Sequence, residues 1–304
     1  MARTAIRSLL DKIYPQPKRQ EEAINVASIP AVVEEVYEEV QPKETLPIEV
    51  AFLGALEATI KNVNNRKNGS SLYYKPSSLK CLRIMYYQKL GMGVGEYLDE
   101  VDSGGIGIGE SGTDRHERIQ EYITKMKENG FNWDFVPVPE FIKEQELTHL
   151  RIKENKHQSK FETNLINEDY GLSFMTDGLL RFNNEYFILE IKTEISSKFY
   201  ARDRVDENHY EQATAYSLSF GLDDVIFLYE NRDTCAKKSF VLHVTEEMKQ
   251  KLIDLIDKCD SYVKAGVLPP KTDNKRICSY CKYKKFCKVN KNVPKPNEEV
   301  IVDD

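Results

Sequence analysis

The sequence contains no long hydrophobic run, which excludes an ordinary membrane protein. No stretch approaches the roughly 18 consecutive apolar residues that a transmembrane helix needs. The first residues, MARTAIRSLLDK, also have neither the apolar core nor the small-residue cleavage site of a secretory signal. We therefore expect a cytoplasmic protein that makes no contact with a membrane.

Cysteine is scarce, with six in 304 residues, so a disulfide scaffold is excluded. Cys235 and Cys259 stand alone in the sequence, and we expect both to pack as small, unreactive side chains. The segment KRICSYCKYKKFC instead gathers three cysteines at the spacing Cys-x2-Cys-x5-Cys. In a reducing compartment such a cluster indicates a metal site, and either zinc or iron suits it. The segment lacks the second ligand pair of a zinc ribbon, so a fourth ligand has to come from elsewhere.

No excess of positive charge marks the whole chain, whose formal net charge is −6. This balance neither identifies nor excludes a nucleic-acid-binding protein, because the distribution of charge matters more than its sum. Residues 271–295 carry nine Lys or Arg and one Asp, whereas residues 18–50 carry eight Glu and three Lys or Arg. The basic stretch can contact phosphates or form a solvated lysine surface. The acidic stretch is typical of a flexible extension.

The order of elements predicts an α/β chain with one main domain. Apolar spacing predicts helices at residues 51–68, 81–90, 113–130, 209–221 and 246–265. Strands are expected at residues 135–142, 160–166, 172–182, 185–193, 223–231 and 237–244. We divide the chain into an acidic extension (1–50), a helical part (51–130), a core (131–268) and a cysteine-rich segment with an acidic tail (269–304).

Residues 104–112, GGIGIGESG, are expected to form a glycine-rich loop. A phosphate-binding loop would need a following Gly-Lys-Ser/Thr and a preceding strand, and both are absent from the sequence pattern. The alternative is a flexible gate.

A hairpin turn at Asn183 and Asn184 would bring two carboxylates together. Asn tolerates the positive φ of such a turn, and cross-strand partners would then have residue numbers that sum to 367. Asp177 would face Glu190, and Lys192 would project from the same face of the sheet. Two like charges in that position destabilise the pair unless a cation lies between them. Mg²⁺ or Mn²⁺ suits these oxygen ligands, and the lysine could orient a water; the alternative is an exposed salt-bridge ladder.

Two helices carry further candidate residues. His116 follows Gly112 on the helix after the glycine-rich stretch, although a lone helical His is often only a surface or core residue. Gln212 and Tyr216 are four residues apart, so they share one face of a helix. They could contact a phosphate or the attacking water, or they could form an ordinary polar helix edge.

The order of these pieces resembles the RecB-like branch of the PD-(D/E)xK nucleases. That branch has a His helix, a G/T-x-D strand end, an E-x-K strand and a Q-x-x-x-Y helix; the Asp element here lacks the residue between Thr176 and Asp177. The resemblance implies a restriction-endonuclease-like core with a mixed central sheet flanked by helices. It also implies a catalytic metal held by His116, Asp177, Glu190 and the carbonyl of Ile191, a water positioned by Lys192, and support or DNA contact from Gln212 and Tyr216. Glu140 is our assignment for the further glutamate that often precedes the Asp.

The cysteines narrow the resemblance to iron-sulfur members, which include the AddB subunit of helicase-nucleases and the exonucleases of the fourth CRISPR-associated (Cas) family. These have one cysteine before the core and three after it, and PSSLKCLRIMYYQKLG looks like the first cysteine helix. The resemblance therefore implies a 4Fe-4S cluster that joins the N-terminal helices to the C-terminal segment. Its ligands would be Cys81, Cys278, Cys281 and Cys287.

We thus expect a metal-dependent DNA nuclease, most simply an exonuclease on single-stranded ends or flaps in recombination, repair or end processing. Arg83, Tyr86 and Tyr87 are expected to contact the DNA strand, the tyrosines by stacking on bases. A helicase, recombinase or other repair protein could bind the N-terminal extension. Two alternatives stay open: a non-catalytic iron-sulfur subunit that binds DNA or assists assembly, and a zinc-ribbon protein with an unrelated core.

Overall fold

The structure, a computed structural model, describes residues 47–64, 72–93, 103–153, 161–279 and 281–288. The chain divides into two compact units, residues 1–64 and 65–304. The described part of the first unit is helix α2 (Ile48–Asn64), which buries none of its side chains. The acidic extension and the partner expected there fall almost entirely outside the described residues. Among the helices of the described ranges, none combines the length and the apolarity needed to cross a bilayer.

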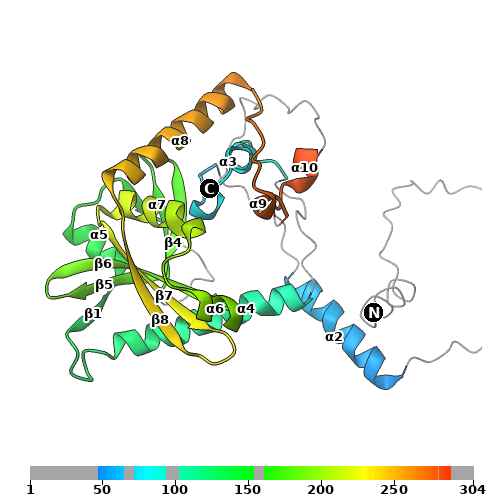
Figure 1. The fold of residues 1–304 in the computed structure, drawn as a ribbon, viewed down its shortest axis with the longest axis horizontal. Helices are drawn as coiled ribbons and strands as arrows, with labels where there is room; N and C mark the ends of the chain where they lie inside the picture. Colours follow the sequence, from blue (N-terminus) through cyan, green and yellow to red (C-terminus); the bar gives the residue numbers. More distant parts are fainter. Residues whose placement is uncertain (1–46, 65–71, 94–102, 154–160, 280, 289–304) are drawn as a thin grey trace, which may run out of the picture. The chain divides into compact units, whose positions relative to one another are not determined.

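The second unit is built on a mixed five-stranded sheet (Figure 1). The strand order is β1-β5-β6-β7-β8; β6 and β7 run parallel, and the other neighbours are antiparallel. The strands are β1 (Trp133–Val136), β5 (Gly178–Phe182), β6 (Glu185–Glu194), β7 (Asp224–Asn231) and β8 (Lys237–His243). The parallel pair requires a crossover, which is made by α6 (Ser196–Ala201), η2 (Glu207–His209) and α7 (Tyr210–Phe220). The expected mixed central sheet is therefore confirmed.

A smaller antiparallel sheet stands beside the first. It has the order β2-β3-β4, with β2 (Leu150–Ile152), β3 (Thr163–Asn167) and β4 (Leu172–Thr176). The remaining elements are helices: η1 (Pro76–Ser78), α3 (Leu82–Lys89), α4 (Ser103–Thr124), α5 (Val138–Glu144), α8 (Glu246–Ala265), α9 (Lys275–Ser279) and α10 (Lys284–Lys288).

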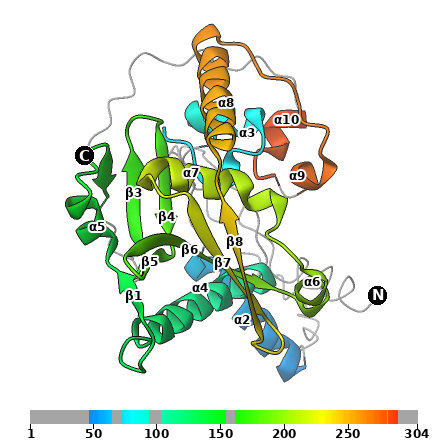
Figure 2. The same cartoon turned by 60° about the vertical axis from the view of Figure 1, so that its left-hand side comes forward.

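The five-stranded sheet is covered on both faces (Figure 2). On one face, Ile119 and Ile123 of α4 pack against Leu189 and Ile191 of β6. On the other face, α7 and α8 pack over Ile188 and the apolar side chains of β7 in the main core. The apolar run of residues 187–191 therefore does belong to a central strand that is buried on both faces, as expected.

The hairpin between β5 and β6 has the predicted register. Arg181 pairs with Tyr186 and Leu179 pairs with Ile188, so the partner numbers sum to 367. Asn183 and Asn184 both have positive φ, 50° and 67°, which is the conformation of a type I′ turn.

Two stretches differ from expectation. The glycine-rich residues 104–112 are helical, so α4 begins at Ser103 rather than Thr113, and it ends at Thr124 rather than Gly130. Glycine weakens a helix by about 1 kcal/mol per residue but does not prevent one from propagating out of a strong neighbouring segment. The expected strand over residues 135–142 ends at Val136, and α5 begins at Val138. Proline suits the first turn of a helix, and α5 has one there.

Candidate active site

Asp177 lies at the bend between β4 and β5, where three elements meet. Its Oδ2 accepts a hydrogen bond of 2.6 Å from the backbone N–H of Ile191, and its carbonyl accepts one of 2.6 Å from Gln120 of α4. The bend requires Gly178, whose φ is +151° and whose Cβ, if present, would lie 2.6 Å from ring carbons of Phe135. The carboxylate is thereby held in one orientation by backbone and helix contacts.

His116, Glu162 and Asp177 form a group that can hold a metal ion. One ligand atom from each of the three lies within 4.8 Å of the others, and no other group of this kind is found among the described residues. The Nδ1 of His116 lies 3.1 Å from Oδ1 of Asp177. Burial lowers the pKa of His116, but the hydrogen bond and charge of Asp177, together with Glu190, raise it overall.

The sequence interpretation missed Glu162. β3 and β4 form a hairpin in which Thr163 pairs with Thr176, so the next pair outward is Glu162 and Asp177. Both strands had been expected, and applying the register rule to the turn at residues 168–171 would have found this glutamate. Burial, with the charge of Asp177 added, raises the pKa of Glu162.

Glu140 was assigned wrongly. It lies exposed on α5, not in a strand beside Asp177. The error follows from the expected strand over residues 135–142, because Val138–Glu144 form the helix α5.

Glu190 anchors a buried chain of hydrogen bonds on the α7 face of the sheet. Its Oε1 accepts from Lys192 Nζ and, at 2.7 Å, from Gln212 Nε2. Gln212 accepts from Lys192 at 3.1 Å and donates to the Tyr216 hydroxyl at 2.7 Å. Tyr216 in turn donates to the carbonyl of Met175 at 2.9 Å, two residues before Asp177.

The structure thus brings Glu190, Lys192, Gln212 and Tyr216 into one network beside the group of His116, Glu162 and Asp177. Glu190 is 4% exposed, and burial raises the pKa of its carboxyl well above the usual range; Lys192 opposes this rise and Asp177 adds to it. Burial likewise raises the pKa of Tyr216. The site therefore carries more buried negative charge than its one lysine compensates.

A nitrogen from His116 and carboxylate oxygens from Asp177 and Glu162, with Glu190 nearby, form a donor set that suits a hard divalent cation such as Mg²⁺ or Mn²⁺. Of the ligands expected from the sequence, His116 and Asp177 lie in this group. Ile191, whose carbonyl was the fourth expected ligand, lies in β6, and its backbone N–H donates to Asp177.

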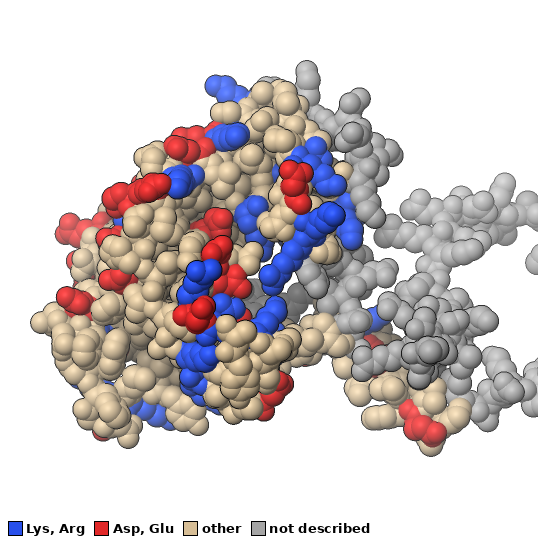
Figure 3. All heavy atoms as spheres, viewed as in Figure 1, with Lys and Arg blue, Asp and Glu red and all other residues tan. Residues whose placement is uncertain are grey.

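A cavity of about 610 Å³ opens next to Lys192, and we call it the basic cavity. Its cations are Lys75, Lys80, Lys192, Lys198, Arg232, Arg276 and Lys282. Its two carboxylates, Glu194 and Asp206, are already paired with Arg202. Figure 3 shows Lys and Arg side chains on both sides of the hollow in this face. Among the described residues, Lys75, Lys80, Lys198 and Arg276 have no carboxylate partner.

The four cysteines expected to bind a cluster lie in one region. Cys81 is buried at the start of α3, and Cys278, Cys281 and Cys287 lie on or next to α9 and α10. Burial raises the pKa of Cys281, and Cys81, Cys287 and Cys278 add to the rise, so these three cysteines lie within electrostatic reach of Cys281.

Arg83, Tyr86 and Tyr87 do not lie where a DNA strand could use them as expected. Arg83 donates to the carbonyl of Pro269 at 2.7 Å and to Cys287 Sγ at 3.3 Å, so it ties α3 to the C-terminal segment. Tyr86 and Tyr87 are 1% and 2% exposed, and Tyr87 packs against aromatic rings of that same segment. Their rings are core residues and have no face available for stacking on a base.

No protein-family model matches the sequence, and no curated protein matches it either. The solved structures that are similar to the chain include the following three. A crystal structure of SSO0001 is 14% identical, with 78% of this chain and 96% of that one covered and a TM-score of 0.40. An alkaline exonuclease (LHK-Exo) from Laribacter hongkongensis is 11% identical, with 72% and 96% covered and a TM-score of 0.39. Its complex with dAMP is 12% identical, with 72% and 95% covered and a TM-score of 0.40. Likenesses this distant do not define the activity of the chain.

Proposed function

We propose that this protein is a metal-dependent DNA nuclease with a PD-(D/E)xK-type site. The observation that carries the proposal is the juxtaposition of His116, Glu162 and Asp177 with Lys192 at the edge of the basic cavity. A structural salt-bridge ladder would need neither this His–carboxylate group nor a neighbouring cavity in which, among the described residues, Lys75, Lys80, Lys198 and Arg276 have no carboxylate partner. Metal-dependent hydrolysis of a phosphodiester uses both a cation site and a surface for phosphates.

His116, Glu162 and Asp177 would hold the metal ion, which when bound would supply Lewis-acid stabilisation of charge on the phosphate. Lys192 is held between Glu190 and Gln212, so its ammonium points at one place and can orient the attacking water. Gln212 and Tyr216 fix that arrangement through the carbonyl of Met175. Their proposed role is support of Lys192 and Glu190.

A single DNA strand is the proposed substrate, acted on from an end or at a flap. The cations of the basic cavity approach Lys192 from η1, from α6 and from α9, so phosphates on successive nucleotides can be met from several sides. A role in recombination, repair or end processing belongs to the same proposal and has its support only in the sequence resemblance.

The test is cleavage of end-labelled single-stranded DNA with Mn²⁺, beside a Lys192→Ala control. We expect the wild-type protein to shorten the strand and the variant to bind it without cutting. Binding by both without any cleavage would overturn the nuclease proposal and favour a non-catalytic DNA-binding subunit.

We further propose that Cys81, Cys278, Cys281 and Cys287 bind a 4Fe-4S cluster. The placement of Cys81, Cys278 and Cys287 within electrostatic reach of Cys281 supports a four-thiolate site, and iron rather than zinc rests on the resemblance. Metal analysis with an absorption spectrum tests this: brown protein with iron is expected, and a Cys81→Ser variant should lose the colour and stability. Colourless protein containing zinc would refute it.

A further inference from the structure

A second fully buried glutamate lies near the proposed metal site but makes no contact with it. Glu230 of β7 is 0% exposed. The parallel register aligns Glu190 with Phe227, so Glu230, three residues further along, lies on the face of the sheet that α4 covers. The nuclease mechanism proposed above therefore gives this carboxylate no role.

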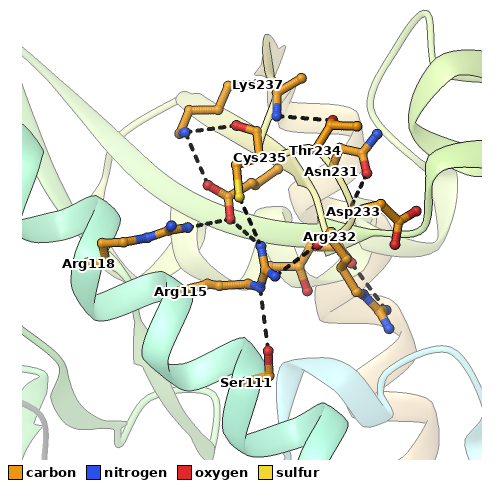
Figure 4. A network of polar contacts seen from close by, with 12 residues as sticks. Ser111, Arg115, Arg118, Asn231, Arg232, Asp233, Thr234, Cys235 and Lys237 are labelled. Carbon is orange, nitrogen blue, oxygen red and sulfur yellow. Dashed lines mark hydrogen bonds and ion pairs between the residues drawn. The ribbon is translucent and has the colours of Figure 1, made fainter.

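Three cations surround this carboxylate. Arg115 Nη1 lies 2.8 Å from Oε1 and Arg118 Nη2 lies 2.6 Å from the same oxygen, while Lys237 Nζ lies 3.1 Å from Oε2. We call Arg115, Arg118, Glu230 and Lys237 the Glu230 cluster. Figure 4 shows Arg115 and Arg118 projecting from α4 toward the β7–β8 turn, with Lys237 approaching from β8. Arg115 also donates to the carbonyl of Arg232 at 2.9 Å.

The Glu230 cluster fixes the part of α4 that makes few packing contacts with the core. None of the described side chains from residue 104 to residue 118 is buried, and Ile119 is the first apolar side chain of α4 that reaches the core. Five glycines in residues 104–112 weaken the helix there. Added Cβ atoms at Gly107, Gly109 and Gly112 would meet nothing within 4 Å, so close packing does not hold this part of the helix either.

His116 lies inside this weakly packed stretch, between Arg115 and Arg118. On its C-terminal side, Gln120 fixes α4 to the carbonyl of Asp177 at 2.6 Å. Arg115, on the N-terminal side of His116, and Arg118, on its C-terminal side, fix α4 to Glu230. The rotation of α4 about its axis, and with it the direction of the His116 ring, therefore depends on both contacts.

We propose that Glu230 is a positioning residue that sets the orientation of His116 through Arg115 and Arg118. Groups that orient a metal ligand contribute about ten- to a hundredfold to metal affinity. The proposal rests on the proposed metal site, because the orientation of His116 matters only if that side chain is a ligand.

The test compares three variants, using Mn²⁺ alone as the ligand in titration calorimetry of the full chain. Glu230→Gln keeps the size of the side chain and removes its charge, whereas Arg115→Met removes one of the two links from α4 to Glu230. Lys237→Met is the matched control, because it also leaves Glu230 with two cations but breaks a contact to β8 rather than to α4. Thermal unfolding in EDTA measures the stability of each variant separately.

We expect Glu230→Gln and Arg115→Met to weaken Mn²⁺ binding by about tenfold or more and Lys237→Met to leave it unchanged. Equal affinity in all four proteins would overturn the positioning role, as would an equal loss in Lys237→Met. Should Glu230→Gln fail to fold, Arg118→Met takes its place, since Arg118 is 42% exposed and its loss leaves no large hole. A wild-type protein that does not bind Mn²⁺ would overturn the proposed metal site and this inference together, whereas normal wild-type binding with unchanged variants overturns the inference alone.

Discussion

Glu190 and Glu230 are both buried, lie on neighbouring strands and face opposite sides of the same sheet, yet their surroundings differ in charge. Glu190 has one ammonium and another carboxylate nearby, and its pKa is raised, first by burial. Glu230 has three cations, and although burial acts in the same direction, Arg115, Lys237 and Arg118 bring its pKa below the usual value. A buried carboxylate that is surrounded by several cations stabilises the fold. A buried carboxylate whose charge is not balanced by nearby cations indicates a site for a further cation.

The largest effect should come from Glu190→Gln in the cleavage assay. Removing this charge leaves Lys192 without its main partner, and we expect at least roughly a thousandfold loss of cleavage, in the range that positioned acid-base groups contribute. The control is Glu211→Gln, which changes another glutamate of the crossover that lies outside the network. Cleavage by Glu190→Gln within a few-fold of wild type would mean that Glu190 is as structural as Glu230.

Glu230→Gln should instead lower the free energy of unfolding. Breaking a buried ion pair from one side costs about 3 kcal/mol, because Arg115, Arg118 and Lys237 are left without their carboxylate. Glu190→Gln should cost less in EDTA, since it removes a buried charge that has only one cationic partner. Urea unfolding of both variants in EDTA measures the two values. An equal loss at the two positions would remove the distinction between them.

The surroundings of Glu190 were largely predictable from the sequence. The Asn183-Asn184 turn and the period of two along a strand set the register, and the register brings Asp177, just before β5, opposite Glu190 in the interior of β6. The apolar run around Glu190 correctly indicated a central strand. Such local rules work because the residues involved are close in sequence.

The Glu230 side was not predictable by the same rules. Arg115 and Glu230 are 115 residues apart, and their contact depends on how α4 lies across the sheet, which no local spacing specifies. Cys235 shows the same limit: expected to be a packing residue, it is exposed in the β7–β8 turn at a φ of 58°, with its sulfur 3.7 Å from Arg115. The glycine-rich residues 104–112 were expected to form a loop because helix propensity does not include contacts with a distant strand, such as the ion pair between Arg115 and Glu230.

Glu162 gives a smaller and more local test of the site. We expect Glu162→Gln to weaken Mn²⁺ binding about tenfold, because it removes one of three clustered ligand groups while His116 and Asp177 remain. Glu140→Gln is the matched control, since this exposed glutamate of α5 was the one expected from the sequence. Calorimetric titration checks both. Weaker binding in Glu140→Gln and not in Glu162→Gln would restore the sequence-based assignment.

The smallest expected effect is the pH dependence of stability without metal, and its sign should differ between the two glutamates. The folded-state pKa of Glu190 is raised, so the folded protein holds that proton more tightly than the unfolded chain does. Stability relative to Glu190→Gln should therefore fall as pH rises from the unfolded-state pKa, about 4.5, through the higher folded-state value. The folded-state pKa of Glu230 is lowered, so its stabilising effect relative to Glu230→Gln should be present above about pH 4.5 and be lost as pH falls through the lower value. Urea unfolding across this range in EDTA checks both trends. Adding Mn²⁺ should remove the fall of stability with rising pH for Glu190 alone. A bound cation would balance the charge of Glu190, as the arginines and the lysine already balance that of Glu230.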